Sequence, residues 1–237
     1  MLTTLILAAG KGTRLKSDKP KVLHEIKGKP SLYHVIDLAK KVSDEVIVIV
    51  GYQHELVEEV VRKNYPNVKF ALQIPQNGTA HAVEISIPQI TKDNDVVVLS
   101  GDVPNLKEES LKNMIDSFYN NKKKTSFIAA EVDDPAKYGR VILDKNNNPK
   151  EVVEFIDLKD DQIDINLINS GVYIFDYNFL VRELSSIKKN DKNGEFFLPD
   201  LIKSAAKIDK AGVSIIEDQK EILGFNTQEQ LKELNNL

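Results

Sequence analysis

The first half of the chain alternates between short, continuously apolar runs and longer segments with helical periodicity. The short runs are rich in Val, Ile and Leu, as in strands buried on both faces of a parallel sheet. The longer segments repeat apolar residues every three or four positions, as a helix with one buried face does. We predict strands at residues 3–8, 46–50, 68–73, 95–100 and 125–132, and helices at 30–42, 55–65, 79–87 and 108–120. This alternation predicts right-handed βαβ units and a doubly wound α/β sheet.

The second half of the chain replaces this alternation with a hairpin and shorter segments. Residues 139–143 and 151–155 flank an Asn-rich turn and predict a β-hairpin. Thr227 precedes an amphipathic segment and predicts the N-cap of a closing helix. The other predicted elements are strands at 168–175, 213–216 and 222–225, and helices at 178–187, 197–207 and 227–234. We interpret residues 133–237 as an insertion and closing elements that complete a cleft formed by residues 1–132, within one domain of 237 residues.

Composition excludes several classes of protein. The chain is 41% hydrophobic and 29% charged, as in ordinary globular proteins, and its net charge of −4 gives no reason to expect nucleic acid as a partner. No apolar run reaches the roughly 18–20 residues of a membrane helix, and the N-terminus does not look like a signal peptide. The absence of cysteine excludes disulfides, thiolate metal sites and a cysteine nucleophile. We therefore expect a cytoplasmic protein that binds neither membranes nor nucleic acid.

A loop of small residues directly after the first predicted strand is the strongest functional signal. Ala8, Ala9, Gly10 and Gly12 leave the backbone accessible to a ligand, and glycine tolerates the turns that such a loop needs. The basic residues that follow are Lys11, Arg14, Lys16, Lys19 and Lys21. Exposed N–H groups together with cations are what a nucleotide polyphosphate requires. The spacing matches neither a P-loop nor a dinucleotide fingerprint, and a tight turn with solvated lysines is the alternative explanation.

Polar residues also follow the third and fourth predicted strands, at the edge where doubly wound sheets bind ligands. Asp102, in the run S-G-D-V-P, suits either a magnesium ligand or a turn residue that caps the next segment. Gln73 and Gln76 carry amides that match a pyrimidine edge, although a polar loop would also explain them. The four histidines lack metal-ligand spacing.

Polar residues in the second half have simple explanations when each is taken alone. The run Y-G-R at 138–140 suits a hairpin, Glu154 suits a surface position and Asn169 suits a turn. Asn226 precedes the final predicted helix and suits a loop or a cap. These residues become informative only together with the motifs of the first half.

The ordered motifs resemble the bacterial N-acetylglucosamine-1-phosphate uridylyltransferases along nearly the whole chain, from Leu5 to Thr227. The matching runs are L-A-A-G-K-G-T-R, P-K-V-L, Q-N-G-T-A-H-A, S-G-D-V-P, D-D-P-A-K-Y-G-R, V-V-E, I-N-S-G, N-G-E-F-F-L-P-D and G-F-N-T. The first run is typical of all sugar-nucleotide nucleotidylyltransferases, whereas the third together with Y-G-R and G-E-F-F is narrower. The resemblance implies a Rossmann-like, mixed but mostly parallel sheet with a β-rich sugar-binding insertion. It also implies a Mg²⁺-dependent reaction in which UTP and N-acetylglucosamine 1-phosphate give UDP-N-acetylglucosamine, a cell wall precursor, and pyrophosphate.

The resemblance assigns roles to individual positions. Arg14, Lys21 and Asp102 would be the catalytic residues, and Asp102 with Asn226 would hold Mg²⁺. The nucleotide-binding residues would be Leu7, Ala8, Ala9, Gly10, Lys11, Gln73, Gln76, Gly78 and Thr79. The sugar-binding residues would be Gly101, Gly139, Glu154 and Asn169.

The sequence departs from the family's usual pattern on the sugar side and at its C-terminus. Ser100 stands where relatives often have an aromatic residue, and Phe155 and Ile156 follow Glu154 where relatives often have a charged residue or histidine. Many relatives continue into a β-helix that transfers acetyl groups and forms trimers. No hexapeptide repeat is present here, so we expect neither that activity nor that trimer, but a monomer or weak oligomer.

Two other functions stay open at the level of sequence. One is a nucleotidylyltransferase for a different sugar 1-phosphate or a different nucleoside triphosphate. The other is a sugar-nucleotide-binding module without catalysis, against which the joint presence of Lys21, Asp102 and Asn226 argues.

Overall fold

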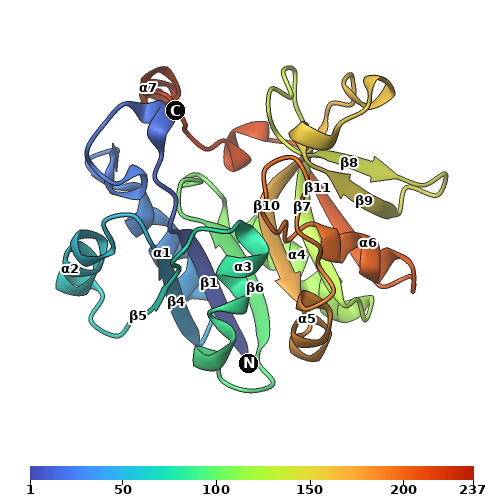
Figure 1. The fold of residues 1–237 in the computed structure, drawn as a ribbon, viewed down its shortest axis with the longest axis horizontal. Helices are drawn as coiled ribbons and strands as arrows, with labels where there is room; N and C mark the ends of the chain where they lie inside the picture. Colours follow the sequence, from blue (N-terminus) through green and yellow to red (C-terminus); the bar gives the residue numbers. More distant parts are fainter.

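Helices cover both faces of one nine-stranded sheet in the computed structural model, which describes residues 1–237 (Figure 1). The central path of the sheet runs in the order β11-β7-β10-β6-β1-β4-β5. These strands are β1 (Leu2–Ala8), β4 (Glu45–Val50), β5 (Lys69–Leu72), β6 (Asp95–Ser100), β7 (Thr125–Glu131), β10 (Leu167–Phe175) and β11 (Ala211–Ile216). Strand β1 is parallel to β4 and β6, β4 to β5, and β11 to β7, whereas β10 runs antiparallel to both β6 and β7. The predicted fold class, a mixed but mostly parallel doubly wound sheet, is confirmed.

The continuous apolar runs form strands because both of their faces are covered. In β1, Leu5 joins the apolar cluster on one face of the sheet and Ile6 joins the cluster on the other, and both side chains are fully buried. Burial of two such side chains contributes about 3–6 kcal/mol, the usual range for two large aliphatic residues. The central strands therefore have little freedom to move relative to one another.

The helices divide into two layers and one terminal element. Helices α1 (Ser31–Val42), α2 (His54–Asn64) and α4 (Glu108–Asn120) bury their apolar sides on one face of the sheet. Helices α3 (Thr79–Glu84), α5 (Tyr177–Leu184) and α6 (Asp200–Ala206) cover the other face. Helix α7 (Gln228–Asn236) lies apart from both layers, beside the loop that follows β1 (Figure 1). No helix has the length and apolar character needed to cross a membrane.

The β-rich insertion is a hairpin attached to β10, an interior strand of the main sheet. Strands β8 (Arg140–Leu143) and β9 (Pro149–Val153) pair with each other, and β8 pairs with β10 through Arg140 and Ile168. A separate two-stranded sheet, β2 (Glu25–Ile26) and β3 (Lys29–Pro30), precedes α1. The hairpin projects on the side of the molecule opposite to α7 in Figure 1.

The structure corrects several predicted boundaries and one predicted strand. Residues 222–225 do not form a strand, because Asp218 caps the 3₁₀ helix Gln219–Ile222 and the backbone after it turns inward to bury Phe225. The helix predicted at 197–207 begins only at Asp200, after Pro199. The helix predicted at 79–87 ends at Glu84, before a 3₁₀ turn that contains Pro88. The predicted Thr227 cap is confirmed, since its hydroxyl accepts the Gln230 N–H.

The strand order brings the polar loops identified in the sequence to one edge. Order β5-β4-β1 extends in one direction from β1, and β6 lies on its other side, so the topology switches between β1 and β6. Ligands of doubly wound sheets bind at the carboxyl ends of the strands beside such a switch. The loops after β1, β5 and β6 all leave the sheet at this edge.

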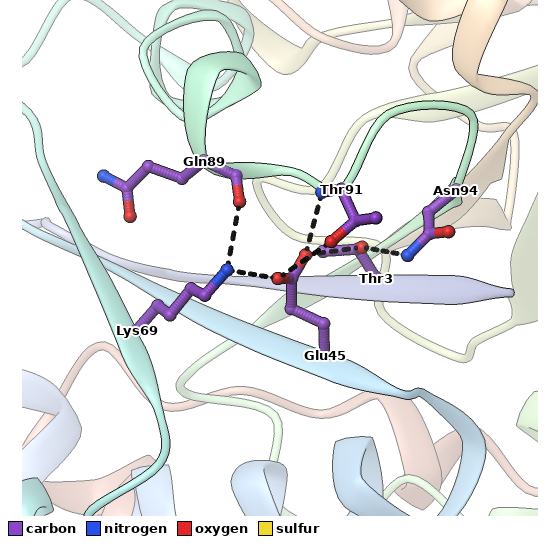
Figure 2. Close-up of polar contacts among 6 residues, drawn as sticks. All are labelled: Thr3, Glu45, Lys69, Gln89, Thr91 and Asn94. Atoms are coloured by element: carbon purple, nitrogen blue, oxygen red, sulfur yellow. Dashed lines mark hydrogen bonds and ion pairs between the residues drawn. The ribbon is translucent and has the colours of Figure 1, made fainter.

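A polar cluster around Glu45 ties together the opposite edge, where the same strands begin. Figure 2 shows its carboxylate, at the first residue of β4, accepting from Thr3, Lys69 and Thr91. The Thr3 hydroxyl donates to Glu45 Oε2 at 2.9 Å, and the Thr91 N–H donates to it at 3.1 Å. Asn94 Nδ2 donates in turn to the Thr3 hydroxyl at 3.2 Å. The cluster thus joins β1, β4, β5 and the segment before β6 at the end remote from the ligand edge.

We expect Glu45→Gln to destabilise the fold in a pH-dependent way. Burial favours the neutral acid, but hydrogen bonds from Lys69, Thr91 and Thr3 outweigh it and hold the pKa of Glu45 below its usual value. A lowered pKa stabilises the fold above the unfolded pKa, and this contribution is lost as pH falls through the folded value. The variant should lose about 1–2 kcal/mol at pH 7, typical for a broken charged hydrogen-bond cluster. The deficit should shrink below about pH 4, the range of an unperturbed Glu.

Urea unfolding of the wild type and of Glu45→Gln from pH 3 to pH 8 measures this difference in the free energy of unfolding. Glu59→Gln, which changes an exposed glutamate paired with Lys63, is the matched control and should change little. An equal loss in both variants, or a loss for Glu45→Gln that persists unchanged at pH 3, would contradict the assignment.

Candidate active site

Two adjoining cavities lie at the edge of the sheet where the loops after β1, β5 and β6 leave it, which we call the ligand edge. The larger, of about 440 Å³, is lined by the loop after β1 and by residues from the segment between β5 and α3. The smaller, of about 210 Å³, lies between β6, β10 and the hairpin. Both are lined by Leu7, Thr79 and Ser100. The predicted nucleotide-binding residues line the larger cavity: Leu7, Ala8, Ala9, Gly10, Lys11, Gln73, Gln76, Gly78 and Thr79.

The loop after β1 presents open backbone and a cation to the larger cavity. Gly12 adopts a left-handed φ of 62°, and a β-carbon built on it would lie 2.8 Å from Lys21 Cβ. Glycine is therefore needed at this position both for conformation and for the passage of the Lys21 side chain. Lys11 is exposed, and its ammonium lies 5.5 Å from the centre of the Tyr52 ring.

The two glutamine amides are held in place by hydrogen bonds within the protein. Gln73 is 4% exposed, and its Nε2 donates to the Gly78 carbonyl at 2.9 Å and lies 3.3 Å from His81 Nδ1. Gln76 Nε2 donates to the Ala9 carbonyl at 2.5 Å, which joins the β5–α3 segment to the loop after β1. The ring of His81, a residue to which the sequence gives no role, contacts the Gln73 amide. The only signal was its place in the run Q-N-G-T-A-H-A.

A strap at residues 196–198 fixes the segment that carries Gly78 and Thr79. The Phe196 N–H donates to the Asn77 carbonyl at 2.8 Å, and the Leu198 N–H donates to the Thr79 hydroxyl at 2.9 Å. Gly78 has a φ of 98°, and a β-carbon there would lie 2.6 Å from the Phe196 carbonyl oxygen. Only glycine permits this approach, so the run N-G-E-F-F acts here through its backbone.

Side chains from three distant parts of the chain converge beside the larger cavity. The Lys21 ammonium forms an ion pair with Asp102 Oδ2 and donates to Asn226 Oδ1 at 2.8 Å. Arg14 Nη2 also donates to Asn226 Oδ1, at 2.9 Å. Asn226 is positioned by its own N–H, which Gln230 Oε1 accepts at 2.7 Å, and by the buried ring of Phe225 beside it. The predicted catalytic and metal-binding residues therefore lie together, although Arg14 and Asn226 line neither cavity.

The donor set at this point suits Mg²⁺. Asp102 supplies a carboxylate oxygen and Asn226 an amide oxygen, and both contact the same cationic group, the Lys21 ammonium. Magnesium prefers hard oxygen donors and usually takes one or two from protein, with phosphate oxygens and water completing its shell. No group of three or more His, Cys, Asp or Glu residues forms a metal site elsewhere in residues 1–237.

Polar groups of the hairpin and β10 line the smaller cavity, together with the half-buried carboxylate of Glu154 and the side chain of Lys137. Asn169 Nδ2 donates to the Tyr173 hydroxyl at 2.6 Å, and the Asn169 N–H donates to the Gly139 carbonyl at 2.9 Å. Glu154 has no cationic partner within ion-pair distance. Burial, followed by the charges of Asp200, Glu195 and Asp157, raises the pKa of Glu154 to about 7.

Of the predicted sugar-binding residues, Gly139, Glu154 and Asn169 line the smaller cavity and Gly101 lines neither. The Gly101 N–H donates to the Leu7 carbonyl at 3.0 Å, so this glycine joins β6 to the end of β1. Ser100 lines both cavities. Phe155 and Ile156 are 44% and 39% exposed and line neither. The unusual residues after Glu154 thus lie outside the cavity, whereas the unusual Ser100 lies within it.

Arg140 is a buried residue whose structural role the sequence analysis missed. Its guanidinium donates to three carbonyls of the preceding loop: Pro135 at 3.0 Å, Ala136 at 3.2 Å and Tyr138 at 2.5 Å. Burial lowers the pKa of this guanidinium, and no carboxylate pairs with it. The loop that it holds carries Lys137 and Tyr138 to the smaller cavity. The run Y-G-R is the only sequence signal for this arginine, and the family resemblance gives a role, sugar binding, to its glycine alone.

Comparison with known families assigns the chain to one of them. The profile of the family described as nucleotidyl transferase matches residues 3–221. The chain belongs to the nucleotidyl transferase family. Its relatives among curated proteins include the bifunctional protein GlmU of Thermotoga sp. (strain RQ2), 39% identical over 231 residues, and that of Clostridium acetobutylicum, 39% identical over 233 residues. These alignments cover 97% and 96% of this nucleotidyl transferase, which spans about half (50%) of the length of each relative.

A solved structure confirms the fold of this nucleotidyl transferase. A Bacillus anthracis protein assigned as a glucose-1-phosphate thymidylyltransferase, in complex with a sucrose, matches with a TM-score of 0.80. The match covers 100% of this chain and 94% of the other at 20% sequence identity, so it concerns the fold alone.

We expect Gly78→Ala to weaken nucleotide binding by the transferase, because the new β-carbon would push the strap away from the cavity. Gly28→Ala is the matched control: Gly28 has a similar φ of 82°, but nothing lies within 4 Å of its β-carbon position. Both changes place alanine at a positive φ, at a cost on the order of 1–3 kcal/mol. Only Gly78→Ala should also weaken triphosphate binding, by at least tenfold in isothermal titration. Equal effects of the two variants on binding would show that the strap does not position the nucleotide segment.

Proposed function

We propose that this chain is an N-acetylglucosamine-1-phosphate uridylyltransferase that uses Mg²⁺ to make UDP-N-acetylglucosamine and pyrophosphate from UTP and N-acetylglucosamine 1-phosphate. The observation that carries the proposal is the position of Lys21 and Asp102, with Asn226, at a cavity that adjoins a second one lined by amide, hydroxyl and carboxylate groups. A nucleotide and a sugar phosphate need two such neighbouring sites with positive charge between them.

Features of the larger cavity support UTP as the nucleotide. Gln73 and Gln76 present amides that can both donate to and accept from a pyrimidine edge. The Gln73 side chain is buried, so a base that does not match its remaining hydrogen-bonding groups would leave them without a partner. The GlmU relatives support the same choice.

Features of the smaller cavity support an N-acetylated amino sugar. Its volume of about 210 Å³ suits one sugar ring. The ionised carboxylate of Glu154 would accept from sugar hydroxyls, and the Asn169 amide, which Tyr173 orients, would contact the acetamido group. The hairpin and β10 hold these polar groups in place, so the cavity would select a sugar by the positions of its hydroxyl and acetamido groups as well as by their chemistry.

The geometry suits direct displacement at the α-phosphorus of UTP. A phosphate oxygen of the sugar phosphate is already anionic and attacks without a general base, and the bond to pyrophosphate breaks on the opposite side. Holding the two substrates in line can lower the barrier by roughly 7–11 kcal/mol. Lys21 and Arg14 lie where they would neutralise charge on the α-phosphoryl group and on departing pyrophosphate. Mg²⁺ held by Asp102 and Asn226 would supply further charge neutralisation on the phosphates.

The proposal predicts one preferred substrate pair. Pyrophosphate release would be measured with UTP, dTTP, CTP, ATP and GTP against the 1-phosphates of N-acetylglucosamine, glucosamine, glucose and galactose. We expect UTP with N-acetylglucosamine 1-phosphate to exceed every other pair in kcat/KM by at least tenfold. A different preferred pair would show that the chain is a nucleotidyl transferase for other substrates. No turnover with any pair would favour a sugar-nucleotide-binding module without catalysis.

Asp102→Asn tests the metal-binding role. The change keeps the side chain's shape but removes the charge that favours Mg²⁺, so turnover should fall by at least a hundredfold while UTP binding changes less than threefold. Asp116→Asn, at an exposed position of α4, is the matched control and should behave as the wild type. Near-normal turnover of Asp102→Asn with Mg²⁺ would remove Asp102 from the mechanism.

Glu154 gives a pH signature specific to the sugar site. Its pKa of about 7 means that the carboxylate gains charge as pH rises from 6 to 8. We therefore expect KM for the sugar phosphate to fall several-fold more in the wild type than in Glu154→Gln over this range. The comparison of the two proteins cancels titration of the substrate's own phosphate, which ionises at about pH 6, and the sugar KM of Glu154→Gln should be high throughout. A sugar KM that varies with pH equally in both proteins would assign the titration to another group.

A further inference from the structure

The Lys21 ammonium occupies the space between the two oxygens that would hold the divalent cation. It contacts Asp102 Oδ2 and lies 2.8 Å from Asn226 Oδ1, and the Lys21 side chain is only 13% exposed. A cation that close to both oxygens leaves no room for a second one between them, and the two positive charges would repel each other strongly in a partly buried site. Either the ammonium or a metal ion can lie there, but not both.

The aliphatic stem of the same side chain packs against Gly12 in the loop after β1, residues 10–13, which we call the nucleotide loop. A β-carbon built on Gly12 would lie 2.8 Å from Lys21 Cβ, 3.4 Å from Cγ and 3.5 Å from Cδ. The stem of Lys21 therefore lies along the loop 10–13, which lines the larger cavity. The ring of Phe225 lies 5.6 Å from the ammonium on the side of the Asn226 segment. Lys21 spans the distance from the nucleotide loop to the Asp102–Asn226 pair.

We propose that Lys21 couples nucleotide binding to metal binding. Its ammonium competes with the divalent cation for Asp102 and Asn226, and a phosphate group bound at the loop draws the ammonium away and frees both oxygens. Metal binding is therefore weak without nucleotide and becomes strong once a phosphate is in place. This inference rests on the proposed function for the identity of the metal pair, but it concerns a role of Lys21 that charge neutralisation in the reaction does not require.

Coupling of this kind is reciprocal, so metal and nucleotide each raise the affinity of the other. Removing the ammonium should break the coupling in a way that simple loss of a binding residue does not. A variant without the charge should bind metal more tightly when nucleotide is absent, because its competitor is gone. It should also respond less to a phosphate ligand, because nothing remains to be drawn away.

Mn²⁺ binding to the full chain, measured by electron paramagnetic resonance without nucleotide, tests the competition. We expect Lys21→Met to bind Mn²⁺ at least tenfold more tightly than the wild type, and Lys21→Gln to do the same should the methionine variant fold poorly. Lys19→Met removes an equal charge from an exposed position of the same segment and should bind as the wild type. Adding Asp102→Asn to Lys21→Met should remove the gain.

Uridine 5′-monophosphate and uridine at matched concentrations test the coupling. The monophosphate should strengthen Mn²⁺ binding to the wild type at least fivefold more than to Lys21→Met, whereas uridine should change neither protein. Unchanged or weaker Mn²⁺ binding by Lys21→Met, or an equal gain in Lys19→Met, would overturn the inference. These binding measurements involve no turnover, so their outcome is independent of the substrate panel. If the wild type is active with UTP and N-acetylglucosamine 1-phosphate but Lys21→Met gains no Mn²⁺ affinity, the proposed function holds and the coupling is wrong.

Discussion

The contact of Lys21 with Asp102 and Asn226 joins three segments that are remote in the sequence. Lys21 follows the loop after β1, Asp102 follows β6 and Asn226 precedes α7. The first two meet because β1 and β6 are parallel neighbours, so their carboxyl ends open at the same edge. Asn226 reaches this edge because Phe225 is buried beside Leu15 and Leu234, which anchors α7 next to the N-terminal loop (Figure 1). Loss of either arrangement would separate the charges on which phosphate chemistry depends.

Rigidity at the site derives from hydrogen bonds that do not involve a ligand. Gln73 and Gln76 are held by backbone carbonyls, the Gly78 segment by the strap at 196–198, and the loop before Arg140 by its guanidinium. The Glu45 cluster holds the opposite ends of β1, β4 and β5. Side chains fixed in this way lose little entropy when substrates bind, which favours accurate alignment of two reacting phosphates.

Much of the fold and of the site was accessible from the sequence because local patterns determine it. Both bounds of α4 agree with its apolar periodicity, and the Thr227 cap follows from a single hydroxyl before an amphipathic run. The small-residue loop and Asp102 were recognisable because their chemistry is local. Long-range features were not accessible: the antiparallel direction of β10, the approach of Phe196 to Gly78, and the carbonyl contacts of Arg140 depend on tertiary packing. Residues 222–225 were predicted as a strand because their apolar pattern reflects burial of Phe225 rather than sheet pairing.

One measurement addresses the central contact directly. Crystals of the full chain grown with UTP and Mn²⁺ would locate the metal by its anomalous scattering. We expect a single strong peak in contact with Asp102 and Asn226 and with phosphate oxygens of UTP, and the Lys21 ammonium turned onto a phosphate oxygen. A peak away from these two side chains, with Lys21 still bridging them and the loop after β1 free of phosphate, would contradict this arrangement.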